Sequence, residues 1–179
     1  VEEEGILFDN FKLVDAGVFL EDKLRAHMAS GPYPARQPDH NVADLKAQIA
    51  AGEKGVREVH RMIEQFGLDV VHAYMRHVQD NAEEQVRRVI EVMRDGEFAY
   101  PLDEGGVVKV RIGFDKEKRE ATVDFTGTSA QRPTNFNAPS AVCRSAVLYV
   151  FRSLIDDNIP LNEGCLKPIN IVIPKGCML

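Results

Sequence analysis

The chain has 179 residues, of which 44% are hydrophobic and 28% are charged, and its formal net charge is −6. This composition is typical of a globular protein, and the length fits one domain. The negative charge argues against non-specific binding to nucleic acid or to acidic membranes. Because no run of 18 apolar residues occurs, we expect no membrane-spanning helix.

Cysteines and histidines are few and give no metal-binding pattern. Cys143, Cys165 and Cys177 are widely spaced without a C-x-x-C motif, which favours free thiols in a reducing cytoplasm. His72 and His77 are five residues apart, so they do not share a helical face as i, i+4 ligands do. We therefore predict no metal site and a cytoplasmic location.

Both ends of the sequence look like internal cuts. The chain begins at Val1 rather than at a methionine, and it stops within an apolar run that directly follows a turn. We therefore expect residues 1–179 to be an internal segment of a longer polypeptide.

The clearest structural signal is a pair of amphipathic helices in residues 41–94. Apolar residues recur there at alternating steps of three and four, and Gly67 interrupts the pattern. A short connection at this glycine predicts an antiparallel helical hairpin. Its apolar stripe either packs on the rest of this chain or contacts a neighbouring subunit, and periodicity does not choose between the two. The stripe consists of Val42, Leu45, Ile49, Val56, Val59, Ile63 and Phe66, and then of Val71, Met75, Val78, Ala82, Val86, Val89 and Met93.

A β-hairpin is predicted within residues 97–126. Two stretches of alternating apolar and polar residues flank a charged turn. Pairing Phe114 with Arg119 brings the apolar side chains of both strands to one face. The same register places Lys109 opposite Asp124, so an ion pair is one explanation of that aspartate.

The remaining chain predicts a buried helix and a further strand. The helix, from about Pro139 to Asp156, is apolar over most of its circumference and is therefore expected to be central and largely buried. Apolar residues alternate again from Ile169 to Ile173. The predicted fold class is α+β, with the long antiparallel helical hairpin in 41–94 and, in 97–179, a small antiparallel β-sheet packed on a central apolar helix.

A polar loop between the hairpin and this helix is the one candidate site. Gly127 lets the chain turn, and Thr126, Thr128, Asn135 and Asn137 are among its small hydrogen-bonding residues. A polar loop that leads to a helix N-terminus is suited to bind an anion or a carboxylate. The alternative is that these side chains only satisfy their own backbone.

Arg144 follows in the first turns of the predicted helix. It either binds a carboxylate there or pairs with an internal acid.

Four stretches of the sequence resemble the hydantoinase B/oxoprolinase family, in one register along the whole chain. They are RQPDHNVAD from Arg36, FGLDVVHAYMRHVQDNAEEQVRRVI from Phe66, ATVDFTGTSAQRPTNFNAPSAVCRSAVLYVFRSL from Ala121, and IPLNEGCLKPINIVIPKGCML from Ile159. The resemblance is strongest to the B portion of the ATP-dependent 5-oxoprolinase type. It implies part of an amidohydrolase that opens 5-oxo-L-proline to L-glutamate in glutathione metabolism.

The resemblance also implies partners and cofactors. ATP and Mg would be bound by a hydantoinase A-like ATP-binding domain or subunit and not by this segment, within a cytoplasmic oligomer that acts on a small lactam. The isolated segment is expected to be inactive. Two alternatives stay open: an N-methylhydantoinase B or acetone carboxylase-type subunit, and a non-catalytic assembly scaffold.

The resemblance gives candidate roles to residues of the polar loop. Asp124 would orient a water molecule or act as a base, and threonine hydroxyls and asparagine amides would hold a substrate carboxylate or an oxyanion. Arg144 matches no family feature and rests on its place near the helix start. The catalytic candidates are Asp124, Thr126 and Thr128, beside Gly127, and the substrate-binding candidates are Asn135, Asn137, Arg144, Arg36 and Asn162.

Overall fold

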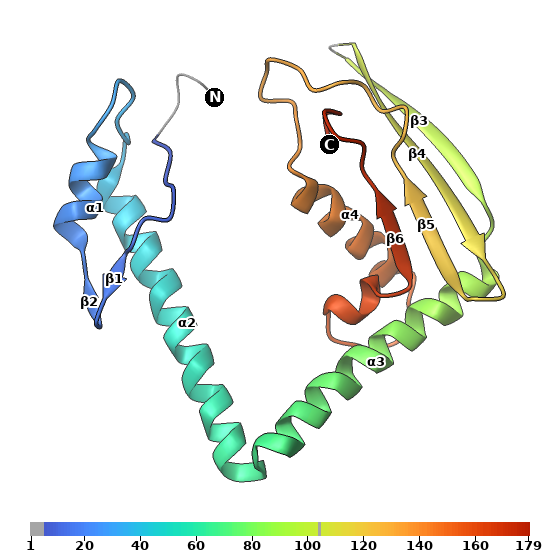
Figure 1. Ribbon diagram of the computed structural model, residues 1–179, viewed down its shortest axis with the longest axis horizontal. Coiled ribbons are helices and arrows are strands. Elements are labelled where there is room, and N and C mark those ends of the chain that lie inside the picture. Colours follow the sequence, from blue (N-terminus) through green and yellow to red (C-terminus); the bar gives the residue numbers. More distant parts are fainter. Residues whose placement is uncertain (1–5, 104) are drawn as a thin grey trace. The chain divides into compact units, whose positions relative to one another are not determined.

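A computed structural model of the protein describes residues 6–103 and 105–179, and the chain divides into two compact units, Val1–Leu68 and Asp69–Leu179. The path of the chain through each unit can be followed in Figure 1. Over the described ranges, no helix combines the length and the apolar character that crossing a membrane requires.

The first unit is built around one long helix. Leu24, Met28 and Val42 form a small buried core where α1 contacts the start of α2. Helix α2 begins at Pro38, three residues before the predicted start, because proline suits the first turn of a helix. The elements of this unit are β1 (Val14–Asp15), β2 (Val18–Phe19), α1 (Glu21–Met28) and α2 (Pro38–Phe66).

The predicted break between the two long helices is confirmed. Gly67 follows α2 with a φ of 85°, a left-handed conformation that glycine adopts without strain. Helix α3 (Leu68–Val92) begins at the next residue. The antiparallel packing of α2 against α3 stays a prediction, because the two helices belong to different compact units.

The second unit contains a four-stranded sheet in the order β3-β4-β5-β6. Neighbouring strands are antiparallel except β5 and β6, which are parallel. The α+β class is confirmed, and the sheet is mixed rather than wholly antiparallel. Besides α3, the elements are β3 (Gly96–Leu102), β4 (Gly106–Asp115), β5 (Glu120–Asp124), α4 (Ser140–Ser153), the short 3-10 helix η1 (Glu163–Leu166) and β6 (Ile169–Val172).

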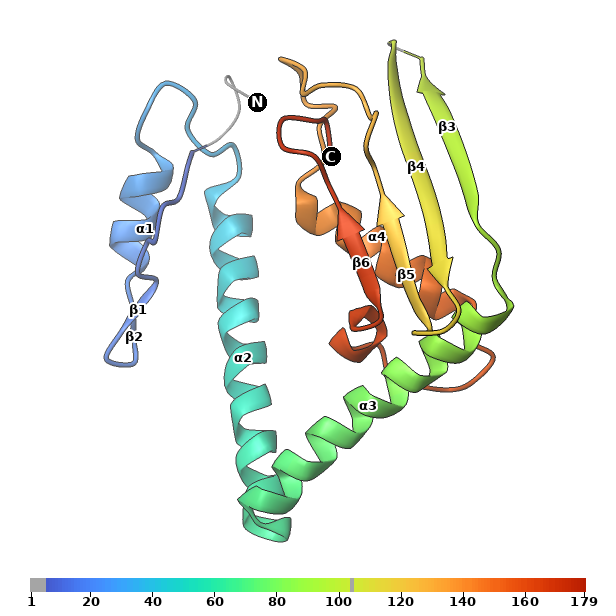
Figure 2. The same cartoon turned by 45° about the vertical axis from the view of Figure 1, so that its right-hand side comes forward.

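One face of this sheet carries the main core. Helix α4 lies along that face in both Figure 1 and Figure 2. The predicted packing of the sheet on an apolar helix is therefore confirmed. The central side chains of the core are Ala82, Val86 and Ile90 from α3, Ala121, Val123 and Phe125 from β5 and the following turn, and Cys143, Val147 and Phe151 from α4.

Part of the predicted apolar stripe belongs to this core. Val86 is 0% exposed, so the second half of α3 packs on its own chain rather than on a neighbouring subunit. Val56 and Phe66 of the stripe in α2 are exposed, and for them the choice stays open.

Helix α4 is buried on one side only, so the expectation that it is largely buried is wrong for its outer side. Val142, Tyr149 and Val150 are exposed, and Tyr149 is 73% exposed. A helix that covers one face of a sheet turns a single flank toward it, and no described residues cover the opposite flank.

The register of the hairpin differs from the prediction by two residues. Phe114 pairs with Ala121, and Asp115 pairs with Glu120 around the turn. Asp115 Oδ1 accepts a hydrogen bond from the backbone N–H of Lys118 in that turn. A shift of two residues keeps every side chain on its original face, so the apolar pattern cannot detect it.

The correct register replaces one predicted contact by another. Arg111, and not Lys109, stands opposite Asp124 across the sheet. Strand β3, which the sequence analysis did not separate from the hairpin, adds Glu97 opposite Arg111 and Ala99 opposite Lys109. The outer face of the sheet therefore carries a group of charged side chains near the end of β5.

Candidate functional site

The candidate site begins where β5 ends. Asp124 Oδ1 accepts a hydrogen bond from the backbone N–H of Thr126 at 2.8 Å and another from Thr126 Oγ1 at 2.6 Å. These two bonds fold the chain back directly after the strand, as aspartate side chains commonly do in turns. The predicted pair Asp124 and Thr126 is therefore brought together, with a structural role for one carboxylate oxygen.

The same contacts set the charge of Asp124. The hydrogen bond from the Thr126 hydroxyl, then the bond from its backbone N–H, lower the pKa of this carboxyl, partial burial opposes them, and the charge of Arg111 adds a further lowering. Asp124 is therefore ionised at neutral pH. A general base works best with a pKa near the working pH, so this carboxylate suits a fixed hydrogen-bond acceptor better than a proton carrier.

The second oxygen of Asp124 remains available. Among the described residues, none donates a hydrogen bond to Oδ2, because both hydrogen bonds from Thr126 end on Oδ1. An ionised oxygen without a protein donor can accept a bond from water or from a ligand.

Thr128 and Gly127 fix the neighbouring strand. Thr128 Oγ1 accepts from the Lys109 N–H at 3.0 Å and donates to the Lys109 carbonyl at 3.1 Å. Gly127 has a φ of 94°, and a Cβ built there would lie 3.0 Å from Lys109 Cδ. The glycine thus allows both the turn and the close passage of the lysine side chain.

The loop that follows is held on both sides. Ser129 Oγ accepts from the Val107 N–H on β4, and the Ser129 carbonyl accepts from the Met178 N–H. Asn137 bonds the Arg132 N–H through Oδ1 and the Arg132 and Thr134 carbonyls through Nδ2. These bonds order the loop before any ligand binds.

Asn135 and Asn137, both predicted to bind substrate, differ in this loop. The amide of Asn137 is occupied by the loop's own backbone. Asn135 is exposed, and its side chain has no hydrogen-bond partner within the described ranges. Asn135 is thus the one of the two whose amide is available to a ligand.

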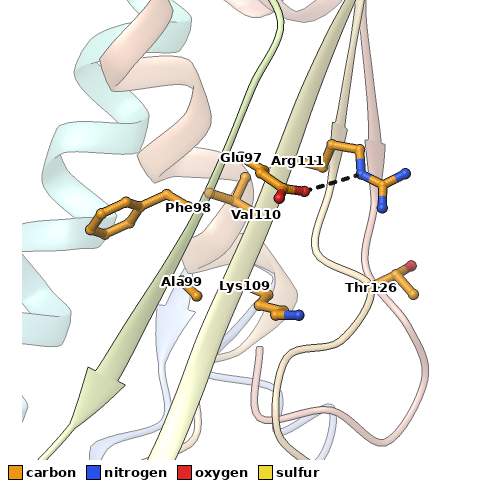
Figure 3. Close-up of a pocket in the computed structure, with 7 residues that line it drawn as sticks. All are labelled: Glu97, Phe98, Ala99, Lys109, Val110, Arg111 and Thr126. Carbon is orange, nitrogen blue, oxygen red and sulfur yellow. Dashed lines mark ion pairs between the residues drawn. The ribbon is translucent and has the colours of Figure 1, made fainter.

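A small cavity of about 230 Å³ adjoins this turn on the outer face of the sheet. Figure 3 shows Lys109, Arg111 and Thr126 directed to the same side, while Phe98 is directed away from them. Arg111 Nε lies 3.9 Å from Glu97 Oε2. The cavity is lined by Glu97, Phe98, Ala99, Lys109, Val110, Arg111 and Thr126.

Comparison with known proteins identifies the family. The sequence profile of hydantoinase B/oxoprolinase matches residues 1–179. The chain belongs to the hydantoinase B/oxoprolinase family. It is 41% identical to a 5-oxoprolinase of Pestalotiopsis fici over 99% of its own length, and 38% identical to 5-oxoprolinase 1 of Arabidopsis thaliana over 99%. It spans only 15% and 16% of the lengths of these two curated relatives.

A solved structure shows the same fold. The ATP-dependent caprolactamase from Pseudomonas jessenii matches 97% of this chain with a TM-score of 0.74 at 22% sequence identity. The match covers 30% of the caprolactamase chain. The segment therefore has the fold of one part of a larger protein.

Two further residues predicted to bind substrate, Arg36 and Asn162, belong to other parts of the described chain. Arg36 lines a separate cavity of about 440 Å³ within the first unit. Asn162 Oδ1 accepts from the Gly164 N–H, and its Nδ2 donates to the Pro160 carbonyl, so its side chain caps η1. Asn162 precedes β6, whereas Asp124 ends the parallel strand β5. The two residues therefore lie at opposite ends of the sheet.

Arg144 is exposed on α4 in this family segment. No described acid pairs with it, so the predicted internal ion pair is not formed within the described ranges. The helix itself begins at Ser140 without a side-chain cap.

Sequence reasoning did not assign Glu97, Lys109 or Arg111 to the site. Lys109 was considered only as the partner of Asp124, and the pairing that placed it there is wrong. A usable signal was present, because Lys109 and Arg111 alternate with the valines of β4 and therefore share its outer face. Over the described ranges, no group of three or more His, Cys, Asp or Glu could hold a metal ion.

Proposed function

We propose that this chain is part of an ATP-dependent amidohydrolase that opens 5-oxo-L-proline to L-glutamate. The observation that carries the proposal is the 41% and 38% identity to proteins named 5-oxoprolinase over almost all of this chain. The ATP dependence named for the structurally similar caprolactamase, which also acts on a lactam by its name, supports the same reaction class.

The strand-end turn supplies the polar groups for this reaction. Opening the ring requires water to add to the lactam carbonyl carbon while the C–N bond breaks and the nitrogen gains a proton. Asp124 Oδ2, ionised and without a protein donor in the described ranges, orients the attacking water. Thr126 holds the other oxygen of Asp124, Thr128 holds the turn against β4, and the Asn135 amide meets the polar part of the substrate.

The energy source lies on another module in this proposal. A hydantoinase A-like ATP-binding domain or subunit binds ATP and Mg²⁺ and activates the lactam carbonyl. The chain spans 15% of a 5-oxoprolinase relative, which leaves ample length for such a module in that protein. We also propose an oligomer in the cytoplasm, where the three free thiols stay reduced.

Two other functions follow from particular observations. The family also includes hydantoinase B, so N-methylhydantoin is an alternative substrate. A subunit of the acetone carboxylase type is a further alternative. The exposed apolar side chains of α2 and α4 favour a second role in assembly.

The proposal is tested with the intact parent protein and three substrates. Purified protein is incubated with ATP and either 5-oxoproline, N-methylhydantoin or acetone with bicarbonate, and both the product and ADP are measured. We expect glutamate and ADP to form from 5-oxoproline, and no turnover by the isolated 179-residue segment. ADP formation only with one of the other two substrates would reject the 5-oxoproline assignment.

A further inference from the structure

Lys109 is held at the candidate cavity by three separate contacts. Its backbone N–H and carbonyl both bond Thr128 Oγ1, and its side-chain stem passes over Gly127, where a Cβ would lie 3.0 Å from its Cδ. Its side chain lines the 230 Å³ cavity together with Arg111 and Thr126 (Figure 3). The strand-end turn therefore positions a cation as well as a carboxylate.

The two cations of this cavity differ in what they already bind. Arg111 lies 3.9 Å from a Glu97 oxygen, and its charge also lowers the pKa of Asp124. In the described part of the chain, no carboxylate oxygen lies within 4.0 Å of Lys109 Nζ. Arg111 is thus shared between the carboxylates of Glu97 and Asp124, whereas the charge of Lys109 is not neutralised by a nearby acid in the described residues.

We propose that Lys109 is the residue that binds the carboxylate of a small lactam acid in this cavity. A lysine ammonium forms strong charge-assisted hydrogen bonds with a carboxylate. The Thr126 hydroxyl donates to Asp124, so its oxygen lone pairs can accept the lactam N–H beside the bound carboxylate. The inference rests on the proposed function and adds to it the residue that separates acidic lactams from neutral ones.

The first test compares substrates with and without the carboxylate. Binding of 5-oxoproline and of 2-pyrrolidinone to the intact parent protein is measured by calorimetry for wild type, Lys109→Met and Lys109→Arg. We expect Lys109→Met to weaken 5-oxoproline binding by about tenfold to a hundredfold, to leave 2-pyrrolidinone binding unchanged, and Lys109→Arg to restore most of the affinity.

A matched variant controls for the loss of a surface charge. Lys23→Met makes the same chemical change at an exposed position of α1 in the first unit, and 5-oxoproline binding should not change. Equal loss of both ligands in Lys109→Met, or no loss of either, would overturn the proposal.

A second measurement separates this inference from the substrate assignment. The acylation rate of Lys109 by acetic anhydride is followed by mass spectrometry with acetate, glutarate, glutamate or 5-oxoproline present, and with chloride at equal ionic strength. Protection of Lys109, and not of Lys23, by carboxylates supports the site even if the protein turns over no 5-oxoproline. Turnover of 5-oxoproline without any carboxylate protection of Lys109 would reject the site and keep the proposed function.

Discussion

At Gly164, the short helix η1 meets the backbone of α3 without room for a side chain. A Cβ at this position would lie 2.1 Å from the Gln79 carbonyl oxygen and 2.7 Å from its carbon. Because both obstacles are backbone atoms, we expect Gly164→Ala to lower the free energy of unfolding by about 1–3 kcal/mol or more. Urea unfolding followed by circular dichroism measures this change.

Gly52→Ala provides the matched comparison. Gly52 lies inside α2, and apart from the nearby backbone of this helix no heavy atom of the described residues stands within 4 Å of the added methyl group. This variant should gain about 0.5–1 kcal/mol, because alanine favours the helix more than glycine does. Equal stability of the two variants would show that η1 and α3 are not in the close contact described.

A second prediction at the residue scale concerns Asp124 and the dependence of folding stability on pH. Its pKa is lower in the folded protein than its ordinary value of 3.8, so the ionised carboxylate stabilises the fold. That contribution is complete above about pH 5 and is lost as the pH falls below 3.8 through the folded-state pKa. Asp124→Asn should therefore be less stable than wild type at pH 7, with a difference that shrinks below about pH 4. Denaturant titrations from pH 3 to pH 8 test this, and a difference independent of pH would contradict it.

At the scale of the element, Lys116 closes the end of α3. Its ammonium group donates to the carbonyls of Ile90, Glu91 and Met93 at the end of this helix, where the last carbonyls lack the partners of a helix interior. Replacing it by methionine should cost about 1 kcal/mol, because a cation at a helix C-terminus also meets the helix dipole favourably. Thermal unfolding measures the loss.

The same turn supplies a control for Lys116. Lys118 forms only an exposed ion pair with Asp115, at 3.4 Å, through its side chain. Surface pairs of this kind contribute about 0–1 kcal/mol, so Lys118→Met should leave the melting temperature almost unchanged. An equal loss in both variants would assign the effect to the turn's net charge instead of to the end of α3.

Long periodic elements could be predicted from the sequence, and the pairing details could not. The repeat from Val71 to Met93 predicted α3, and the alternation around Val110 predicted β4. Strand β3 was not recognised, because its apolar side chains stay exposed and Pro101 interrupts its pattern, which an edge strand tolerates. The outer face of α4 was predicted to be buried because apolar content alone does not reveal whether a covering layer is present.

For the candidate site, the residue types predicted the place but not the roles. The Asp-Phe-Thr-Gly-Thr run located the strand-end turn correctly. Asn137 and Asn162 carry the same amide as Asn135, and only the folded backbone shows that their side chains close loops. Lys109 was missed because the predicted register placed it opposite Asp124 as an ion-pair partner. In the structure Arg111 takes that position.

At the scale of the whole molecule, the chain spans only a small part of the length of the proteins that it resembles. It covers 15% of a 5-oxoprolinase relative and 30% of the caprolactamase chain whose fold it shares. Tyr149 and Val150 leave an apolar strip on the outer side of α4, and Val56 and Phe66 leave another on α2. Surfaces of this kind are expected where further parts of a large enzyme pack.

The most direct test of the account is ATP-dependent glutamate formation from 5-oxoproline by the intact parent protein carrying Asp124→Asn. The central claim is that the strand-end turn orients the attacking water, so turnover should fall by about a hundredfold or more at pH 7.5. Asp44→Asn, the same change at an exposed position of α2, should keep wild-type turnover. Near-normal turnover by Asp124→Asn, measured at a temperature at which the variant stays folded, would contradict the account and place the chemistry outside this segment.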